Sequence, residues 1–96
     1  MLNQQNILSL LRSAKPGLER KYGISTLALF GSYSRNTAVV GSDVDVLVEF
    51  SKPVGIQFMD LADELEELLN HKVDLVSRKA IKPGYFEHIQ PQLIYV

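Results

Sequence analysis

Three aspartates lie where predicted strands could carry them to one site. Asp43 and Asp45 are two residues apart in a segment that is typical of a strand, so their side chains point to the same face. Such a pair of carboxylates repels itself unless a cation lies between the two. Asp74 lies in the middle of another apolar segment, where an unpartnered charge is costly. Carboxylate oxygens suit magnesium, so the pattern predicts a magnesium site if the two strands are neighbours.

A glycine-serine turn supplies the second half of the predicted site. Gly31 and Ser32 follow the apolar run 27–30 directly. Glycine lets the backbone come close to an anion, and the serine hydroxyl with nearby N–H groups can hold phosphate oxygens. Arg35 could add positive charge against a triphosphate, although an exposed surface arginine is an equally good reading of this position.

The combined spacing identifies a family resemblance. Gly31-Ser32, then ten residues, then Asp43-x-Asp45 resembles the signature of the DNA polymerase β-like nucleotidyltransferase superfamily. The resemblance runs from about residue 20 to the C-terminus and includes the strand that carries Asp74. The short chain is similar to the minimal, MNT-domain branch, and to MntA-type antitoxins of HEPN/MNT toxin–antitoxin pairs. It implies an α/β (α+β) fold, a small mixed sheet flanked by helices.

The resemblance also implies a reaction. Asp43 and Asp45 would ligate two Mg²⁺ ions, and Asp74 would ligate one of them and help to deprotonate an acceptor hydroxyl. The hydroxyl would attack the α-phosphorus of ATP, and pyrophosphate would leave. In the antitoxin branch the acceptor is a tyrosine of a HEPN-domain toxin ribonuclease. That partner would supply the acceptor-binding domain for which this chain has no room.

One departure from the family pattern lies in the turn. Ser34, Arg35 and Asn36 stand where family members often have alanine, arginine and glycine. Asn36 can still take a left-handed conformation, so the turn is expected to keep its function.

Two other functions remain open. The chain could be a non-catalytic antitoxin that neutralises its partner by binding, or a nucleotidyltransferase for a small-molecule or RNA acceptor held by another subunit. The intact carboxylates argue against a decayed site, because they would burden stability without a metal. The net charge of −1 argues against direct nucleic-acid binding.

The elements that must position these residues follow from apolar periodicity. We expect a helix over 3–14 that is either interrupted near Pro16 or followed by a second helix, with a stop at Gly23. Strands are expected over 25–30, 43–50 and 72–77, a short helix or loop over 33–41, and a helix over 56–70. A turn at Pro83-Gly84, a short helix over 85–90 and an apolar segment over 93–96 complete the chain.

Several polar and aromatic residues receive a structural interpretation. Glu49 is read as a surface charge, His71 as a helix-end residue and His88 as structural. Tyr33 could pack or stack on a base. The segment 93–96 could form an edge strand, fold back on the core or bind a partner.

Composition sets the remaining bounds. Ninety-six residues are expected to form one domain, 1–96. There is no cysteine, which excludes disulfides and thiol chemistry. The first six residues are too polar for a signal peptide, and no apolar run is long enough to span a membrane. A cytoplasmic protein is expected, and it could form a homo- or hetero-oligomer.

Overall fold

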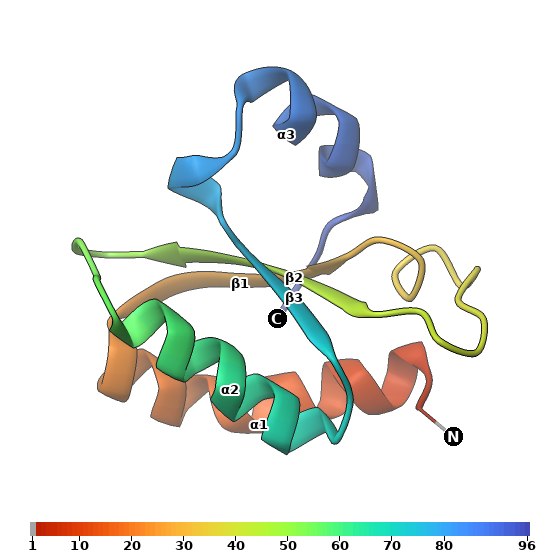
Figure 1. The fold of residues 1–96 in the computed structure, drawn as a ribbon, viewed down its shortest axis with the longest axis horizontal. Helices are drawn as coiled ribbons and strands as arrows, with labels where there is room; N and C mark the ends of the chain where they lie inside the picture. The colour runs from red at the N-terminus through yellow and green to blue at the C-terminus, as the bar shows by residue number, and fades with distance from the viewer. Residues whose placement is uncertain (1) are drawn as a thin grey trace.

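The computed structural model describes residues 2–96 as one mixed sheet between two layers of helix (Figure 1). The helices and strands, in chain order, are α1 (Gln4–Tyr22), β1 (Ile24–Phe30), β2 (Val44–Phe50), α2 (Gln57–Leu69), β3 (Val73–Ser77), α3 (Pro83–Ile89) and β4 (Ile94–Tyr95). Two short 3₁₀ turns, Arg78–Ala80 and Gln90–Gln92, flank α3. The expected α/β (α+β) class is confirmed.

The sheet has the strand order β3-β2-β1-β4. β1 runs antiparallel to both β2 and β4, whereas β2 and β3 are parallel and joined through α2. The crossover helix is what a parallel pair requires. The order places β2, which carries Asp45 and directly follows Asp43, at the centre of the sheet beside the strand that carries Asp74.

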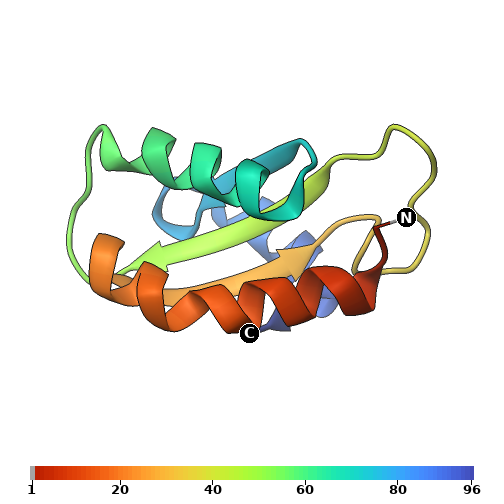
Figure 2. The same ribbon diagram turned by 90° about the horizontal axis from the view of Figure 1, so that it is seen from below.

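Each face of the sheet has its own apolar core. α1 and α2 cover one face, and α3 with its two 3₁₀ turns covers the other (Figures 1 and 2). Val44, Val46 and Val48 of β2 face the α1/α2 layer, and Leu47 faces the smaller cluster beneath α3. This alternation along β2 was expected from its period of two, and it puts Asp45 on the α3 face.

The first helix runs without interruption through Pro16. Neither a break nor a second helix starts there, so both alternatives for this segment were wrong. Proline removes the hydrogen bond to the carbonyl of Arg12. Both residues are exposed, so water can satisfy that carbonyl. The helix ends where expected, because Gly23 takes a φ of +72° and donates its N–H to Glu19.

The C-terminal segment differs from the expected turn and helix. Pro83 and Gly84 do not form a separate turn, since α3 begins at Pro83 itself. Proline is favoured at the first helical position, where its missing N–H costs nothing. Among the three readings of 93–96, the edge strand is confirmed: β4 pairs with β1, and Val96 N–H bonds to the carbonyl of Leu27.

Candidate functional site

The turn after β1 lies against the second aspartate of the pair. Phe30 is the register partner of Asp45 across the antiparallel β1–β2 ladder. The next residue, Gly31, is buried and has a φ of +78°. A Cβ atom at Gly31 would overlap Oδ2 of Asp45 and lie 2.8 Å from its Cγ. Glycine is therefore required here twice over, by backbone conformation and by the carboxylate that packs on it.

The carboxylates of the expected triad come together at one end of the sheet. Asp45 and Asp74 are register partners in the parallel β2–β3 pair, and Asp43 stands just before β2. Burial, as the largest cause, and the nearby charges of Asp74 and Asp43 together raise the pKa of Asp45 to about 6, against the opposing effect of Arg35. The condition set by the sequence, that the two strands be neighbours, is met.

The charge pattern suits a divalent cation. Within residues 2–96, no group of three or more Asp, Glu, His or Cys side chains is arranged to hold a metal ion by itself. Mg²⁺ does not need one, because it keeps several waters and takes ligands from substrate phosphates. The charges of Asp74 and Asp43 add to burial in raising the pKa of Asp45, and a divalent cation would relieve that repulsion. The donor set of Asp43, Asp45 and Asp74 therefore fits magnesium.

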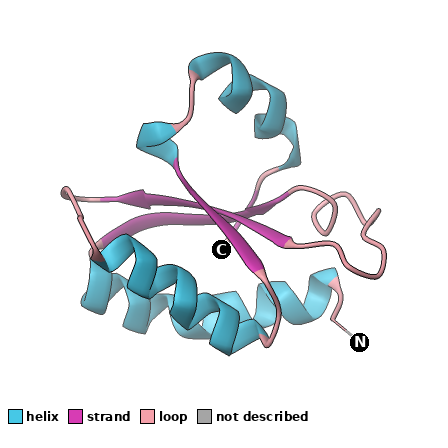
Figure 3. Cartoon of the chain, viewed as in Figure 1, coloured by secondary structure: helices cyan, strands magenta, loops and turns pink. Residues whose placement is uncertain are grey.

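The turn that follows β1 is held by consecutive backbone hydrogen bonds. The N–H groups of Ser34 and Arg35 both donate to the carbonyl of Gly31, and Thr37 N–H donates to the carbonyl of Ser32. Asn36 takes a φ of +59°, which confirms its expected left-handed conformation. Figure 3 shows this segment as part of the long irregular connection between β1 and β2. The turn holds Ser32 beside the carboxylates.

A pocket of about 270 Å³ is lined by both the turn and Asp45. The expected residues Gly31, Ser32, Arg35 and Asp45 all line it. Asp43 and Asp74 are outside its lining, at the neighbouring strand ends. The pocket is also lined by Phe30 at the end of β1 and, on its other side, by C-terminal residues that the sequence did not single out for it: Tyr85, His88, Ile89 and Gln92.

The two histidines and Tyr33 have distinct places. His88 is exposed and lines the pocket, so it is not a core residue. Tyr33 is buried and meets the ring of His71 edge-on at 5.9 Å, which favours the packing interpretation over base stacking. A ring nitrogen of His71 hydrogen-bonds the carbonyl of Ser42 at 2.6 Å. His71 thus anchors the backbone next to Asp43, a role for which the sequence carried no signal.

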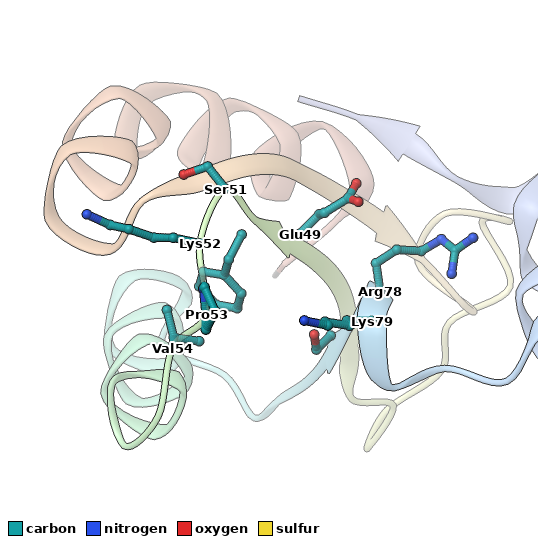
Figure 4. A pocket seen from close by; sticks show the side chains of 9 residues that line it. Glu49, Ser51, Lys52, Pro53, Val54, Arg78 and Lys79 are labelled. Carbon is teal, nitrogen blue, oxygen red and sulfur yellow. The ribbon is translucent and has the colours of Figure 1, made fainter.

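A larger pocket lies away from the aspartates, and its charged side chains do not form a site. Its volume is about 560 Å³, and it lies at the far ends of β2 and β3, between the 3₁₀ turn at Arg78 and the loop at Lys52 (Figure 4). In Figure 4 the side chains of Lys52 and Arg78 extend in opposite directions, and the guanidinium of Arg78 stacks 3.7 Å from the ring centre of Phe86. Its charges do not converge, and Glu49 is an exposed charge at its edge, as expected.

Comparison with known proteins identifies the family. A model of the nucleotidyltransferase domain matches residues 11–94. The chain belongs to this family. It is 37% identical over 97 residues to the protein adenylyltransferase MntA of Thermococcus cleftensis, across 100% of this chain and 98% of that protein.

Solved structures place the chain in the minimal branch. A structure assigned to the minimal nucleotidyltransferases has a TM-score of 0.81 at 30% identity and covers 97% of this chain and 95% of its own. A toxin–antitoxin structure with AMP-PNP has a TM-score of 0.71 at 29% identity, over 98% and 72% of the two chains. A tri-AMPylated Shewanella oneidensis HEPN toxin in complex with an MNT antitoxin matches with a TM-score of 0.61 at 26%, over 97% and 67%.

These findings confirm the family resemblance and the class of enzyme. The chain is a nucleotidyltransferase of the MNT type, and its fold is that of the minimal nucleotidyltransferases. In residues 2–96 no helix combines the length and apolar character needed to cross a membrane.

Proposed function

We propose that the chain is a magnesium-dependent adenylyltransferase that moves AMP from ATP to a tyrosine hydroxyl of a HEPN-type toxin ribonuclease and thereby acts as its antitoxin. The observation that carries this proposal is the contact between Gly31 and Asp45, with Asp74 beside Asp45 on the next strand. It brings the turn and Asp45 to one pocket, with Asp43 and Asp74 at the neighbouring strand ends. The similar proteins include a protein adenylyltransferase, a toxin–antitoxin structure with AMP-PNP and an AMPylated HEPN toxin in complex with an MNT antitoxin, which supports ATP and the toxin as substrates.

Each side chain of the site has a part in this reaction. Ser32 donates its hydroxyl and N–H to phosphate oxygens of ATP, and Arg35 adds positive charge from the same turn. Asp43, Asp45 and Asp74 would hold Mg²⁺, which when bound neutralises phosphate charge and lowers the pKa of the acceptor hydroxyl. Asp74 is the exposed member of the set, so it is the carboxylate that an incoming hydroxyl can reach to give up its proton.

The covalent change is a substitution at the α-phosphorus. The tyrosine oxygen forms a bond to that phosphorus as the bond to the β-phosphate oxygen breaks, and pyrophosphate leaves. The phenolic proton passes to a carboxylate of the site. The product is an AMP ester of the tyrosine, and the site is ready for another ATP.

The surroundings of the pocket suit a protein acceptor in a heteromeric complex. The connection that precedes Asp43 exposes Val39 and Val40, which are 70% and 90% accessible, and Tyr85 at the pocket wall is 50% accessible. Apolar side chains that face water next to a reaction site favour burial by a partner. Both proteins of the pair would meet in the cytoplasm.

A transfer experiment tests the proposal. The purified chain would be incubated with α-labelled ATP, Mg²⁺ and the HEPN-type protein encoded beside it. We expect label on the partner with the wild type and a loss of at least a hundredfold with Asp45→Asn, since the site then lacks a ligand and a charge. Glu49→Gln is the matched control: it removes a carboxylate from the same strand and face, outside the site, and should transfer like the wild type.

The alternatives give different results in the same experiment. A tight complex without label, with wild type and Asp45→Asn neutralising the toxin equally, would leave a binding antitoxin. Label on added RNA or on a small molecule, and none on the partner, would assign a different acceptor. Equal transfer by wild type and Asp45→Asn would refute the site itself.

A further inference from the structure

The side chain of Gln92 is fixed against the phosphate-binding turn. Gly31 N–H donates to Oε1 of Gln92 at 3.1 Å, and the hydroxyl of Ser34 donates to the backbone carbonyl of Gln92 at 2.8 Å. These two bonds join the turn to a residue 61 positions away in the chain, in the 3₁₀ turn before β4. The amide plane of Gln92 therefore has a defined orientation, because only its oxygen can accept from Gly31.

The other half of the same amide is available to a ligand. Gln92 lines the pocket that contains Ser32, Arg35 and Asp45. Within residues 2–96 its Nε2 has no hydrogen-bond partner, and no buried side-chain nitrogen or oxygen is left unsatisfied. The nitrogen is thus open to solvent, and its two N–H donors are held at the pocket by the bond through Oε1.

The bond also changes the role expected of Gly31. The sequence suggested that backbone N–H groups of the turn hold phosphate oxygens, but the N–H of Gly31 is already used by Gln92. The site loses one donor from the turn and gains two from an amide. Gln92 thereby replaces the backbone N–H as a neutral donor at this place.

We propose that Gln92 is a nucleotide-binding residue that donates Nε2–H to a phosphate oxygen of the bound triphosphate. Phosphate oxygens only accept hydrogen bonds, and Ser32 and Arg35 beside Gln92 contribute donors and positive charge. Because the amide carries no charge, it can hydrogen-bond a phosphate oxygen without also attracting the carboxylates of the site. This inference rests on the proposed function, because it takes the pocket of Asp45 to be the nucleotide site.

Gln92→Glu tests the donor without removing the anchor. The glutamate has the same shape, and one of its oxygens can still accept from Gly31 N–H, but it offers an acceptor and a negative charge where Nε2 stood. Gln90→Glu is the matched control, because Gln90 is exposed in the same 3₁₀ turn and does not line the pocket. Dissociation constants for ATP and for inorganic tripolyphosphate, both with Mg²⁺, and thermal unfolding would be measured for each.

We expect the melting temperatures of Gln92→Glu and Gln90→Glu to agree within a few degrees. Gln92→Glu should bind both ligands roughly tenfold or more weakly than the wild type does. Gln90→Glu should bind like the wild type. Equal affinity of Gln92→Glu and wild type for ATP would overturn the inference while the proposed function stands. Weakened ATP but unchanged tripolyphosphate would also overturn it, by moving the contact to the nucleoside. A wild type that binds neither ligand would instead sink the proposed function.

Discussion

Replacing Gly31 by alanine should damage stability and activity more than any other glycine substitution in the chain. The new Cβ would overlap Oδ2 of Asp45 and lie 2.8 Å from its Cγ, at a residue whose φ is +78°. The left-handed conformation alone costs a non-glycine residue roughly 1–2 kcal/mol. Moving Asp45 off its rotamer, or shifting the strand, adds about 1–3 kcal/mol.

Gly41 provides the matched control. Its φ is +93°, yet a Cβ there has no atom within 4 Å, so Gly41→Ala carries the conformational cost without the clash. The difference between the two variants isolates the contact with Asp45. At about 4–8 °C per kcal/mol for a domain of this size, Gly31→Ala should melt roughly 5–20 °C below Gly41→Ala.

The assay is thermal and urea unfolding of both variants, with ATP binding measured where each is folded. Gly31→Ala should also lose nucleotide binding, because relief of the clash moves Asp45. The double variant Gly31→Ala/Asp45→Gly should recover part of the stability and none of the transfer activity, because the effects of substitutions at two residues in contact do not add. If Gly31→Ala is no less stable than Gly41→Ala, the packing of Asp45 on Gly31 is not what demands a glycine here.

Two further predictions concern Asp45 and α3. Because the folded pKa of Asp45 is raised from 3.8 to about 6, the folded state holds a proton that the unfolded state has released between those values, so wild-type stability falls as pH rises through that window. Without divalent cations, Asp45→Asn should be more stable than wild type at pH 7 by roughly 1 kcal/mol, a value discounted for the partial exposure of Asp45. Urea titrations should show this advantage disappear below pH 4. A difference in stability that does not change with pH would contradict the raised pKa. Ile89→Ala, at the last residue of α3, which is 2% exposed, should cost about 2–4 kcal/mol and weaken ATP binding. Leu65→Ala on the opposite face, fully buried, should cost a similar amount and leave the affinity of the folded fraction unchanged.

The strand that carries the aspartates was readable from sequence because its signal is local. Side chains alternate along a strand, so Asp43 and Asp45 had to share a face and Val44 and Val46 had to take the other. The pairing of β2 with β3 could not be predicted from the sequence and entered only as a condition for the site. In the structure the two apolar strands, joined by a helix, are buried side by side, and Asp45 lies opposite Asp74.

The C-terminal wall of the pocket could not be predicted in the same way. Tyr85, His88 and Gln92 lie on a short helix and a 3₁₀ turn whose place depends on the packing of Ile89 in one buried cluster with Leu47. No spacing within the segment points to Gly31, which is 61 residues away from Gln92. The same limit explains Pro16, whose tolerance inside α1 depends on exposure rather than on sequence pattern.

The position of the site follows from the direction of the strands. In open parallel sheets ligands bind beyond the carboxyl ends of the strands, but here the carboxylates lie at the start of β2 and β3. β1 runs antiparallel to β2, so the end of β1 at Gly31 meets the start of β2 at Asp45. The turn and the carboxylates therefore share one edge, although ten residues separate Ser32 from Asp43. A slip of one residue in either register would turn Asp45 to the opposite face, among Val44 and Val46. The strand registers are therefore what keeps Asp45 beside the turn and beside Asp74.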